Sequence, residues 1–165
     1  MSQVALLGSP NCGKSALFNA LTGGNQKIAN YPGVTVDRKV GSAKTPSGQD
    51  VRIIDLPGTY SLNPQSPDEE ITRNILASME TDFVVAVADA TNLERTLGLT
   101  LEIIGMGKPM VLVLNMVDLA EKRGIKINID KLSKQLGVLV VPTVAIKRVG
   151  IDRLLAEIET LTKTR

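Results

Sequence analysis

Residues Gly8 to Ser15 read Gly-Ser-Pro-Asn-Cys-Gly-Lys-Ser, the G-x-x-x-x-G-K-S pattern that is typical of a phosphate-binding loop, or P-loop. Gly8 and Gly13 let the backbone wrap closely around a phosphate, because neither residue carries a Cβ atom. The backbone N–H groups between them form a nest for an anion. Lys14 adds a point charge for the β- and γ-phosphates, and the Ser15 hydroxyl is suited to ligating Mg²⁺.

The elements around this loop favour a nucleotide site over a chance match in a glycine-rich turn. Residues 4–7 are apolar and predict a buried strand before the loop, and residues 16–21 predict a helix after it. That helix begins near Lys14 and adds the positive end of its dipole to the loop. We therefore expect nucleotide contacts along the loop, from Gly8, Asn11, Cys12, Gly13, Lys14, Ser15 and Ala16.

A second motif, Asp55-Leu-Pro-Gly58, follows another predicted strand. The Asp55 carboxylate can hold Mg²⁺, usually through a water molecule, and Gly58 can offer its backbone N–H to a γ-phosphate. Taken alone, an aspartate followed by a Pro-Gly turn is commonplace at the end of a strand. Its position behind a P-loop favours the metal and phosphate roles.

A third motif, Asn115-Met116-Val117-Asp118, indicates which base is bound. The two acceptor oxygens of Asp118 suit the N1–H and N2–H₂ donors of guanine, a pair of donors that adenine lacks. Asn115 can tie this segment back to the P-loop, and Met116 keeps an apolar stem where lysine is often found. The alternative is that Asp118 only caps the start of a helix.

Two weaker candidates complete the predicted site. Thr35, which follows Gly33-Val34, is the candidate for a switch threonine whose hydroxyl joins Mg²⁺ and whose N–H meets the γ-phosphate; the alternative is an ordinary threonine at the start of a strand. In Val144-Ala145-Ile146, the N–H of Ala145 is expected to meet the guanine O6. The pattern at Ala145 is weak, because loops that contact guanine in this way usually carry Ser-Ala, whereas this chain has Val-Ala at residues 144–145.

The elements that must position these residues alternate between strand and helix. Alternation of this kind predicts an α/β fold with a doubly wound, mostly parallel sheet and helices on both faces. Every motif directly follows a predicted strand, which is the end of a parallel sheet where ligands bind. Strands are expected at residues 4–7, 36–44, 50–54, 83–88, 110–114 and 138–141, with residues 25–34 as a mobile loop.

The predicted helices are defined by their caps and apolar stripes. Ser66 is expected to cap a helix whose buried stripe is Ile71, Ile75, Leu76 and Met79. The next helix is expected to bury Leu93, Leu97, Leu101 and Ile104, a shorter one to bury Ile129, Leu132 and Leu136, and the closing helix to bury Ile151, Leu154, Leu155, Ile158 and Leu161. We expect a single domain over residues 1–165.

Composition excludes several classes of function. The 165 residues carry a net charge of +2 and few aromatic residues, which argues against a nucleic-acid partner. The absence of histidine removes histidine catalysis and histidine metal ligands. Cys12 is the one cysteine, and we expect it to be a small residue packed against the P-loop rather than a redox or metal centre. No leader or membrane-spanning run is visible, so direct membrane insertion is not expected.

The chain resembles the N-terminal G domain of FeoB-type ferrous iron transport proteins. The resemblance is carried by residues 8–15, Asn30-Tyr-Pro-Gly-Val-Thr35, Asp55-Leu-Pro-Gly-Thr-Tyr-Ser-Leu62, Asp89-Ala-Thr-Asn-Leu-Glu-Arg95 and residues 115–118. The P-loop alone fits many proteins, whereas residues 55–62 and 89–95 are much more specific. The resemblance implies a Ras-like P-loop G domain that binds GTP and GDP with Mg²⁺.

The resemblance also implies a role and a setting. It implies slow GTP hydrolysis coupled to Fe²⁺ uptake across the bacterial inner membrane, by a cytoplasmic domain that continues into a helical regulatory domain and a membrane permease. Such domains can form oligomers. The alternatives are a GTPase of ribosome assembly or tRNA modification, which shares the Pro-Asn-x-Gly-Lys-Ser loop, and a nucleotide-binding module without useful turnover.

Catalysis in this resemblance depends on Asn11, Lys14, Thr35 and Gly58. Thr59 stands where Ras-type GTPases carry the glutamine that orients water. Asn11 stands where potassium-activated GTPases carry a P-loop asparagine that helps to hold K⁺, which takes the place of an arginine finger. The alternative role for Asn11 is a hydrogen bond that braces the loop.

Overall fold

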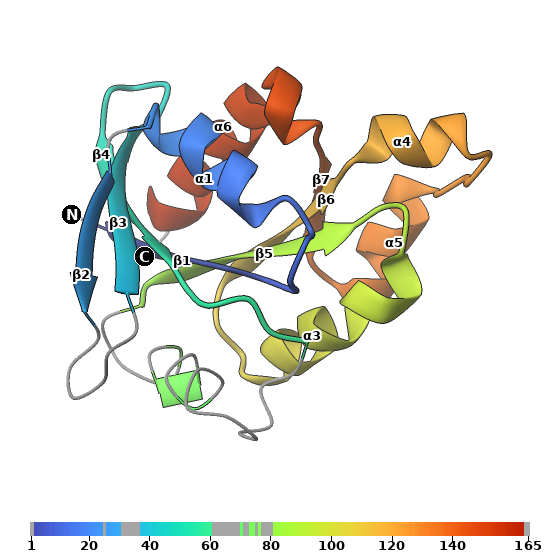
Figure 1. Cartoon of the computed structure of the whole chain (residues 1–165), viewed down its shortest axis with the longest axis horizontal. Helices are drawn as coiled ribbons and strands as arrows, with labels where there is room; N and C mark the ends of the chain where they lie inside the picture. The colour runs from blue at the N-terminus through green and yellow to red at the C-terminus, as the bar shows by residue number, and fades with distance from the viewer. Residues whose placement is uncertain are drawn as a thin grey trace.

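A computed structural model describes residues 2–24, 26–30, 37–60, 70, 73–74, 76 and 81–163 (Figure 1). Thr35, Ser66, Ile71, Ile75 and Met79 lie outside the described residues. The elements in chain order are β1 (Ser2–Gly8), α1 (Lys14–Thr22), β2 (Gln26–Asn30), β3 (Asp37–Lys44), β4 (Asp50–Asp55), β5 (Phe83–Asp89), α3 (Leu93–Gly105), β6 (Met110–Asn115), α4 (Val117–Lys122), α5 (Ile129–Leu136), β7 (Leu139–Pro142), the 3₁₀ turn η1 (Ala145–Lys147) and α6 (Ile151–Lys163).

The described strands form one mixed sheet in the order β2-β3-β4-β1-β5-β6-β7. β1 pairs in parallel with β4 and β5, and the parallel pairing continues through β6 to β7. β2 and β3 pair antiparallel at one edge. The predicted doubly wound, mostly parallel sheet is therefore confirmed.

Helices cover both faces of this sheet (Figure 1). Alternate residues of the central strands point to opposite faces. On β1, Val4 and Leu6 pack with α1 and α6, while Ala5 and Leu7 pack with α3 on the other face. All four side chains are fully buried, which explains why β1 is an uninterrupted apolar run in the sequence. The P-loop thus begins from a strand that both layers of helices hold in place.

The parallel register brings the ends of four strands to one edge of the sheet. Leu6 of β1 lies beside Asp55 of β4, and Gly8 lies beside Val87 of β5. Asp89 of β5 in turn lies beside Asn115 of β6. The motifs at residues 8–15, 55–58 and 115–118 consequently meet although up to about a hundred residues separate them.

Residues Gln26–Asn30 form strand β2, so the prediction of a loop over residues 25–34 is wrong for this part. β2 pairs antiparallel with β3, with Gln26 beside Gly41 and Asn30 beside Asp37. An edge strand is held by the backbone hydrogen bonds of one neighbour, and the mixed sequence Gln-Lys-Ile-Ala-Asn has no alternation that would predict it.

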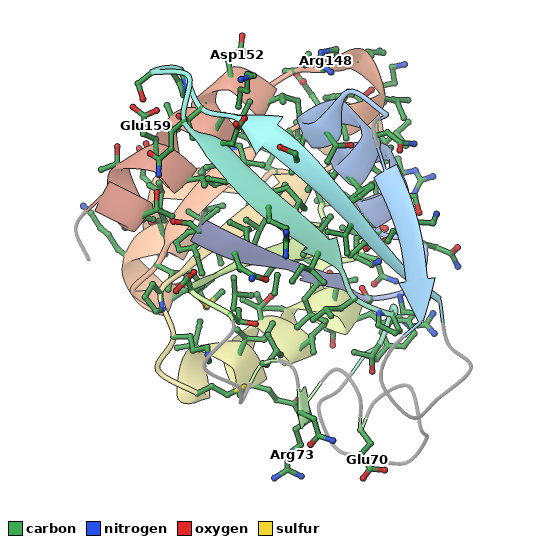
Figure 2. The ribbon with its side chains drawn as sticks, turned by 90° about the vertical axis from the view of Figure 1, so that its left-hand side faces the viewer. Glu70, Arg73, Arg148, Asp152 and Glu159 are labelled. Carbon is green, nitrogen blue, oxygen red and sulfur yellow. The ribbon has the colours of Figure 1, made fainter. Side chains whose placement is uncertain are left out.

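The turn that joins β3 and β4 is fastened to the last helix. Ser47 donates from its backbone N and from Oγ to one carboxylate oxygen of Glu159 on α6, at 3.0 and 2.8 Å. Figure 2 shows Glu159 beside this turn. The turn spans residues 46–49, and Gly48 adopts a φ of 88° there. Among the described helices, none is long and apolar enough to cross a membrane.

Helix α3 buries a different face from the one predicted. Its buried residues are Thr96, Leu99, Thr100 and Ile103, whereas Leu101 is 53% exposed. The predicted stripe of Leu93, Leu97 and Ile104 is only partly buried. The buried face includes two threonines, so a search for apolar residues at helical spacing does not find it. Thr96 can be buried because its hydroxyl donates to the carbonyl of Asn92 at 3.0 Å.

The two leucines of α3 therefore differ in what they contribute to stability. We expect Leu99→Ala to lower the free energy of unfolding by about 2–5 kcal/mol, because Leu99 is 2% exposed and its loss leaves a cavity. Leu101→Ala is the matched control and should change it by less than about 0.5 kcal/mol. Urea unfolding followed by circular dichroism measures both. A larger loss from Leu101→Ala than from Leu99→Ala would contradict the observed face.

Candidate functional site

The P-loop forms a hollow at the end of β1. Its volume is about 500 Å³, and it is lined by Ser9, Pro10, Asn11, Gly13, Lys14, Ser15 and Gly58. Asn11 and Ser15 are exposed there, so their side chains are available to a ligand. α1 begins directly from the loop, where Leu17 donates its N–H to the carbonyl of Gly13 at 3.0 Å. A helix start facing a hollow of this size suits the phosphates of a nucleotide.

Both glycines of the motif are required by their surroundings. A Cβ atom on Gly8 would lie 2.6 Å from Sγ of Cys12, and one on Gly13 would overlap Nδ2 of Asn115. Gly13 also has a φ of 86°, a conformation that favours glycine. Asn11 adopts a similar conformation at 66°, which asparagine tolerates better than most residues.

Lys14, which lines the hollow, forms an ion pair with Asp55 at the end of β4. Nζ of Lys14 contacts Oδ1 of Asp55 and donates to the carbonyl of Leu56 at 2.7 Å. Both side chains are largely buried, at 12% and 9% exposure. The pair holds the ammonium group beside the loop, and it joins the end of β4 to the start of α1.

The oxygen atoms near this pair fit Mg²⁺. Mg²⁺ in nucleotide sites is held by one or two protein oxygens together with substrate phosphates. Asp55 and Ser15 offer a carboxylate and a hydroxyl at the loop. Within the described ranges, no cluster of three histidine, cysteine or acidic residues forms a self-sufficient metal site. The donors present therefore suit a metal that arrives with a nucleotide.

Gly58 lies against the P-loop from the other side. The nearest atoms to a Cβ built on Gly58 are the backbone N and Cα of Pro10, at 3.4 Å. The next residue, Thr59, is 4% exposed and donates its N–H to the carbonyl of Gly8 at 3.1 Å. These contacts place the Gly58 backbone at the rim of the hollow, and its expected contact with a γ-phosphate stays a prediction.

Asn115 joins three segments at the opposite end of the site. Its Nδ2 donates to the carbonyl of Cys12 at 3.1 Å. Its Oδ1 accepts from Oγ1 of Thr143 at 2.9 Å and from the N–H of Ala145 at 3.1 Å. Asn115 is 3% exposed, so its polar atoms are satisfied inside the protein. The predicted tie between Asn115 and the P-loop is present.

Asp118 lies in the first turn of α4 and does not cap it. The N-cap residue is Met116, with a φ of 62°, so the capping role weighed for Asp118 is wrong. Oδ2 of Asp118 lies 3.4 Å from Nζ of Lys147 in η1, and the Asp118 side chain is 25% exposed. The carboxylate thus remains accessible to a ligand.

The loop between β7 and α6 holds residues that sequence reasoning missed. Thr143 and Lys147 bond to Asn115 and Asp118, and Arg148 bonds to α1. Arg148 has a φ of 58° and donates from Nη1 to the carbonyl of Ala20 in α1 at 2.8 Å (Figure 2). The positive φ of Arg148 and the distant hydrogen-bond partners of these three residues correspond to no sequence motif, so the sequence does not predict them. The expected contact of Ala145 with a guanine O6 stays a prediction, because its N–H bonds to Asn115 here.

Cys12 is a packing residue of the loop. It is 1% exposed and belongs to the core that α1 and α6 cover. Burial raises the pKa of its thiol to about 11, against a smaller opposing effect of the nearby Lys14 charge. The interpretation of Cys12 as a small packed residue is consistent with both observations.

These features define the class of protein. A strand, a P-loop and a helix, with an aspartate motif after β4 and an Asn-x-x-Asp motif after β6, make an α/β domain of the P-loop GTPase fold. A sequence model of the family described as "Ferrous iron transport protein B" matches residues 2–158. The chain belongs to this family.

Curated relatives agree with this assignment. The Fe(2+) transporter FeoB of Escherichia coli (strain K12) is 46% identical over 155 residues, which are 92% of this chain and 20% of that protein. The Fe(2+) transporter FeoB of Salmonella typhimurium (strain LT2) matches with the same identity and coverage. The chain therefore spans about a fifth of the length of these relatives.

Solved structures of the family share the fold. The cytosolic domain of L. pneumophila FeoB matches with a TM-score of 0.92 and 44% identity, over 97% of this chain and 63% of that chain. The cytosolic domain of T. maritima FeoB in its GMPPNP form gives 0.91 and 45%, over 99% and 63%. A GDP-bound mutant of the S. thermophilus FeoB G domain gives 0.90 and 48%, over 95% and 60%.

The burial of Cys12 makes its reactivity testable. The thiolate is the form that is alkylated, and the pKa is raised from 9.0 to about 11. We expect iodoacetamide at pH 8 to label the folded protein about a hundredfold more slowly than the urea-unfolded chain. Mass spectrometry reports on this site alone, because the chain has one cysteine. Equal rates would contradict the packed thiol.

The same shift has a consequence for stability. Because the unfolded chain loses the thiol proton first, we expect this contribution to folding to be complete below pH 9 and lost as the pH rises towards about 11.

Proposed function

We propose that this domain binds guanine nucleotides and slowly hydrolyses GTP with Mg²⁺, and that its parent protein uses this switch in ferrous iron uptake. The observation that carries the proposal is the bond from Asn115 to the P-loop carbonyl of Cys12 at 3.1 Å. It brings a base-reading motif and a phosphate-binding loop to one site. The GDP and GMPPNP forms of solved relatives support the same ligand class.

Nucleotide recognition is divided between the two ends of this site. Asp118 accepts the two adjacent donors of guanine, and its neighbour Met116 flanks the base. The loop from Gly8 to Ala16 binds the phosphates with backbone N–H groups, and Lys14 neutralises the β- and γ-phosphates. Ser15 and Asp55 hold Mg²⁺. Thr35 is a further ligand in this proposal, although it lies outside the described residues.

Turnover needs positive charge near the transferring phosphoryl group. Thr59 cannot act as the water-orienting glutamine does, because it is short, 4% exposed and bonded through its N–H to Gly8. Asn11 is exposed at the hollow, so its side-chain oxygen is available to help hold K⁺. K⁺ bound there supplies the charge that an arginine finger supplies elsewhere. Gly58 contributes its backbone N–H to the γ-phosphate.

Family membership supports a proposal about the setting of the domain. The curated relatives are about five times as long as this chain, which leaves room for a helical regulatory domain and a membrane permease in the parent. We propose that this domain is the cytoplasmic part of such an inner-membrane protein, with oligomers possible and no nucleic-acid partner. Family membership favours this setting over ribosome assembly or tRNA modification.

The role of Asp118 can be tested by exchanging its hydrogen-bonding pattern. Xanthine has an acceptor where guanine has its N2 amino donor. We expect Asp118→Asn to weaken GDP binding by about 2–4 kcal/mol, because an acceptor is lost, and to strengthen xanthosine diphosphate binding. Titration calorimetry with both nucleotides measures the exchange.

Glu121→Gln is the matched control, since it removes a negative charge from the same helix at an exposed position. It should leave both affinities unchanged. If Asp118→Asn keeps its preference for GDP over xanthosine diphosphate, Asp118 does not read the base.

The role of Asn11 is tested by the choice of salt. We expect the unmodified protein to hydrolyse GTP faster in KCl than in NaCl, by less than the roughly 10³–10⁵ that an arginine finger provides. Asn11→Ala should lose this advantage and keep GDP binding. Asn19→Ala, an exposed asparagine on α1, is the control and should retain it. Equal rates of the unmodified protein in the two salts would remove K⁺ from the mechanism.

A further inference from the structure

We propose that Arg95 is a positioning residue for GTP hydrolysis, which acts by holding the ring of Tyr60 and so fixing the segment that carries Gly58. The inference rests on the proposed GTPase function. It assigns a role to residues 89–95, a block that is among the most specific in the sequence and that supplies none of the proposed nucleotide contacts.

The side chains of Arg95 and Tyr60 are in contact at the surface of the domain. The guanidinium carbon of Arg95 lies 4.4 Å from the centroid of the Tyr60 ring. This distance is within the range of a cation–π contact. Figure 1 shows the segment that follows β4 running to α3. Tyr60 is 37% exposed, so part of the residue remains open to solvent.

Tyr60 comes two residues after Gly58, and the residue between them is fixed independently. Thr59 donates its N–H to the carbonyl of Gly8 at 3.1 Å, and Leu56 donates to Leu6 at 3.1 Å. Among the described residues of this segment, which runs along the P-loop, the contact with Arg95 is the one that lies furthest from β4. Without it, the segment would still be attached at Thr59, but Tyr60 would be free to move away.

The turn that precedes the helix of Arg95 is held by several hydrogen bonds. The turn before α3 is closed by Asp89, whose Oδ1 accepts from the N–H and the hydroxyl of Thr91 at 2.8 and 2.6 Å. The N–H of Ala90 donates to the backbone carbonyl of Asn115 at 2.9 Å. The turn before α3 is thus attached to the last residue of β6, next to the base-reading motif. A continuous set of contacts then leads from Asn115 through α3 and Tyr60 to Gly58.

This arrangement predicts a specific kinetic effect. Exposed cation–π contacts are weak, so we expect Arg95→Ala to lower kcat for GTP about two- to fivefold. The dissociation constant for GDP should not change, because the segment is proposed to act on the γ-phosphate side. A merely structural role would instead weaken GDP binding and GTP turnover together.

The experiment compares single-turnover GTP hydrolysis across matched variants. Tyr60→Phe keeps the aromatic face and should retain the rate, whereas Tyr60→Leu should lose as much as Arg95→Ala. Arg95→Lys keeps the cation and should be partly rescued. The double variant Arg95→Ala with Tyr60→Leu should be no slower than either single variant. Arg153→Ala, which removes an exposed arginine from α6, is the control and should match the unmodified protein.

A second measurement tests the contact without using turnover. The chain has two tyrosines, Tyr31 and Tyr60, and no tryptophan. In a Tyr31→Phe background, tyrosine emission therefore reports on Tyr60 alone. We expect acrylamide to quench this emission more strongly after Arg95→Ala, because one face of the ring is uncovered. Unchanged quenching would overturn the proposed contact.

The outcomes separate this inference from the function on which it rests. An unmodified protein that does not hydrolyse GTP would overturn the proposed GTPase function and this role with it. Normal hydrolysis that is unaffected by Arg95→Ala, or additive losses in the double variant, would overturn the positioning role and leave the GTPase function standing.

Discussion

The site depends on one buried side chain, Asn115. Its amide group donates to Cys12 of the P-loop and accepts from Thr143 and Ala145 after β7, while its backbone carbonyl accepts from Ala90 before α3. Asn115 is 3% exposed, so a hydrogen bond left unmade by its amide group would cost a large amount of folding free energy. The bonds therefore keep the partner segments in fixed positions relative to one another. The loops that follow β1, β5, β6 and β7 are thereby joined into one structural unit.

The sheet makes this arrangement possible, and the P-loop glycines make it fit. Strands β1, β5 and β6, which are buried along most of their length, set the positions of the strand ends, because both faces of the sheet are packed. Asn115 can approach the loop only because Gly13 has no Cβ to meet its Nδ2. On the phosphate side, the ion pair of Lys14 and Asp55 gives a second tie between strand ends. The Asn115 motif and the Asp55 motif are thus each held to the P-loop segment.

The sequence predicts those parts of the fold and the site whose cause is local. The P-loop, the Asp55 and Asn115 motifs and the central strands each leave a dense pattern of glycine, polar or apolar residues. β2 leaves none, because an edge strand needs only the backbone of β3. The inner face of α3 includes Thr96 and Thr100, which an apolar count discards. Thr143, Lys147 and Arg148 act through contacts to residues far away in the chain, which no short motif records.

The central claim is that Asn115 holds the P-loop and the loop after β7 as one unit. Amide hydrogen exchange of the nucleotide-free Asn115→Ala variant tests it most directly. The account predicts faster exchange both in residues 9–13 and in residues 143–150, with unchanged exchange at Ile53 in β4, whose surroundings do not include Asn115. Faster exchange confined to the direct partner Ala145, with the P-loop amides protected as in the unmodified protein, would contradict it.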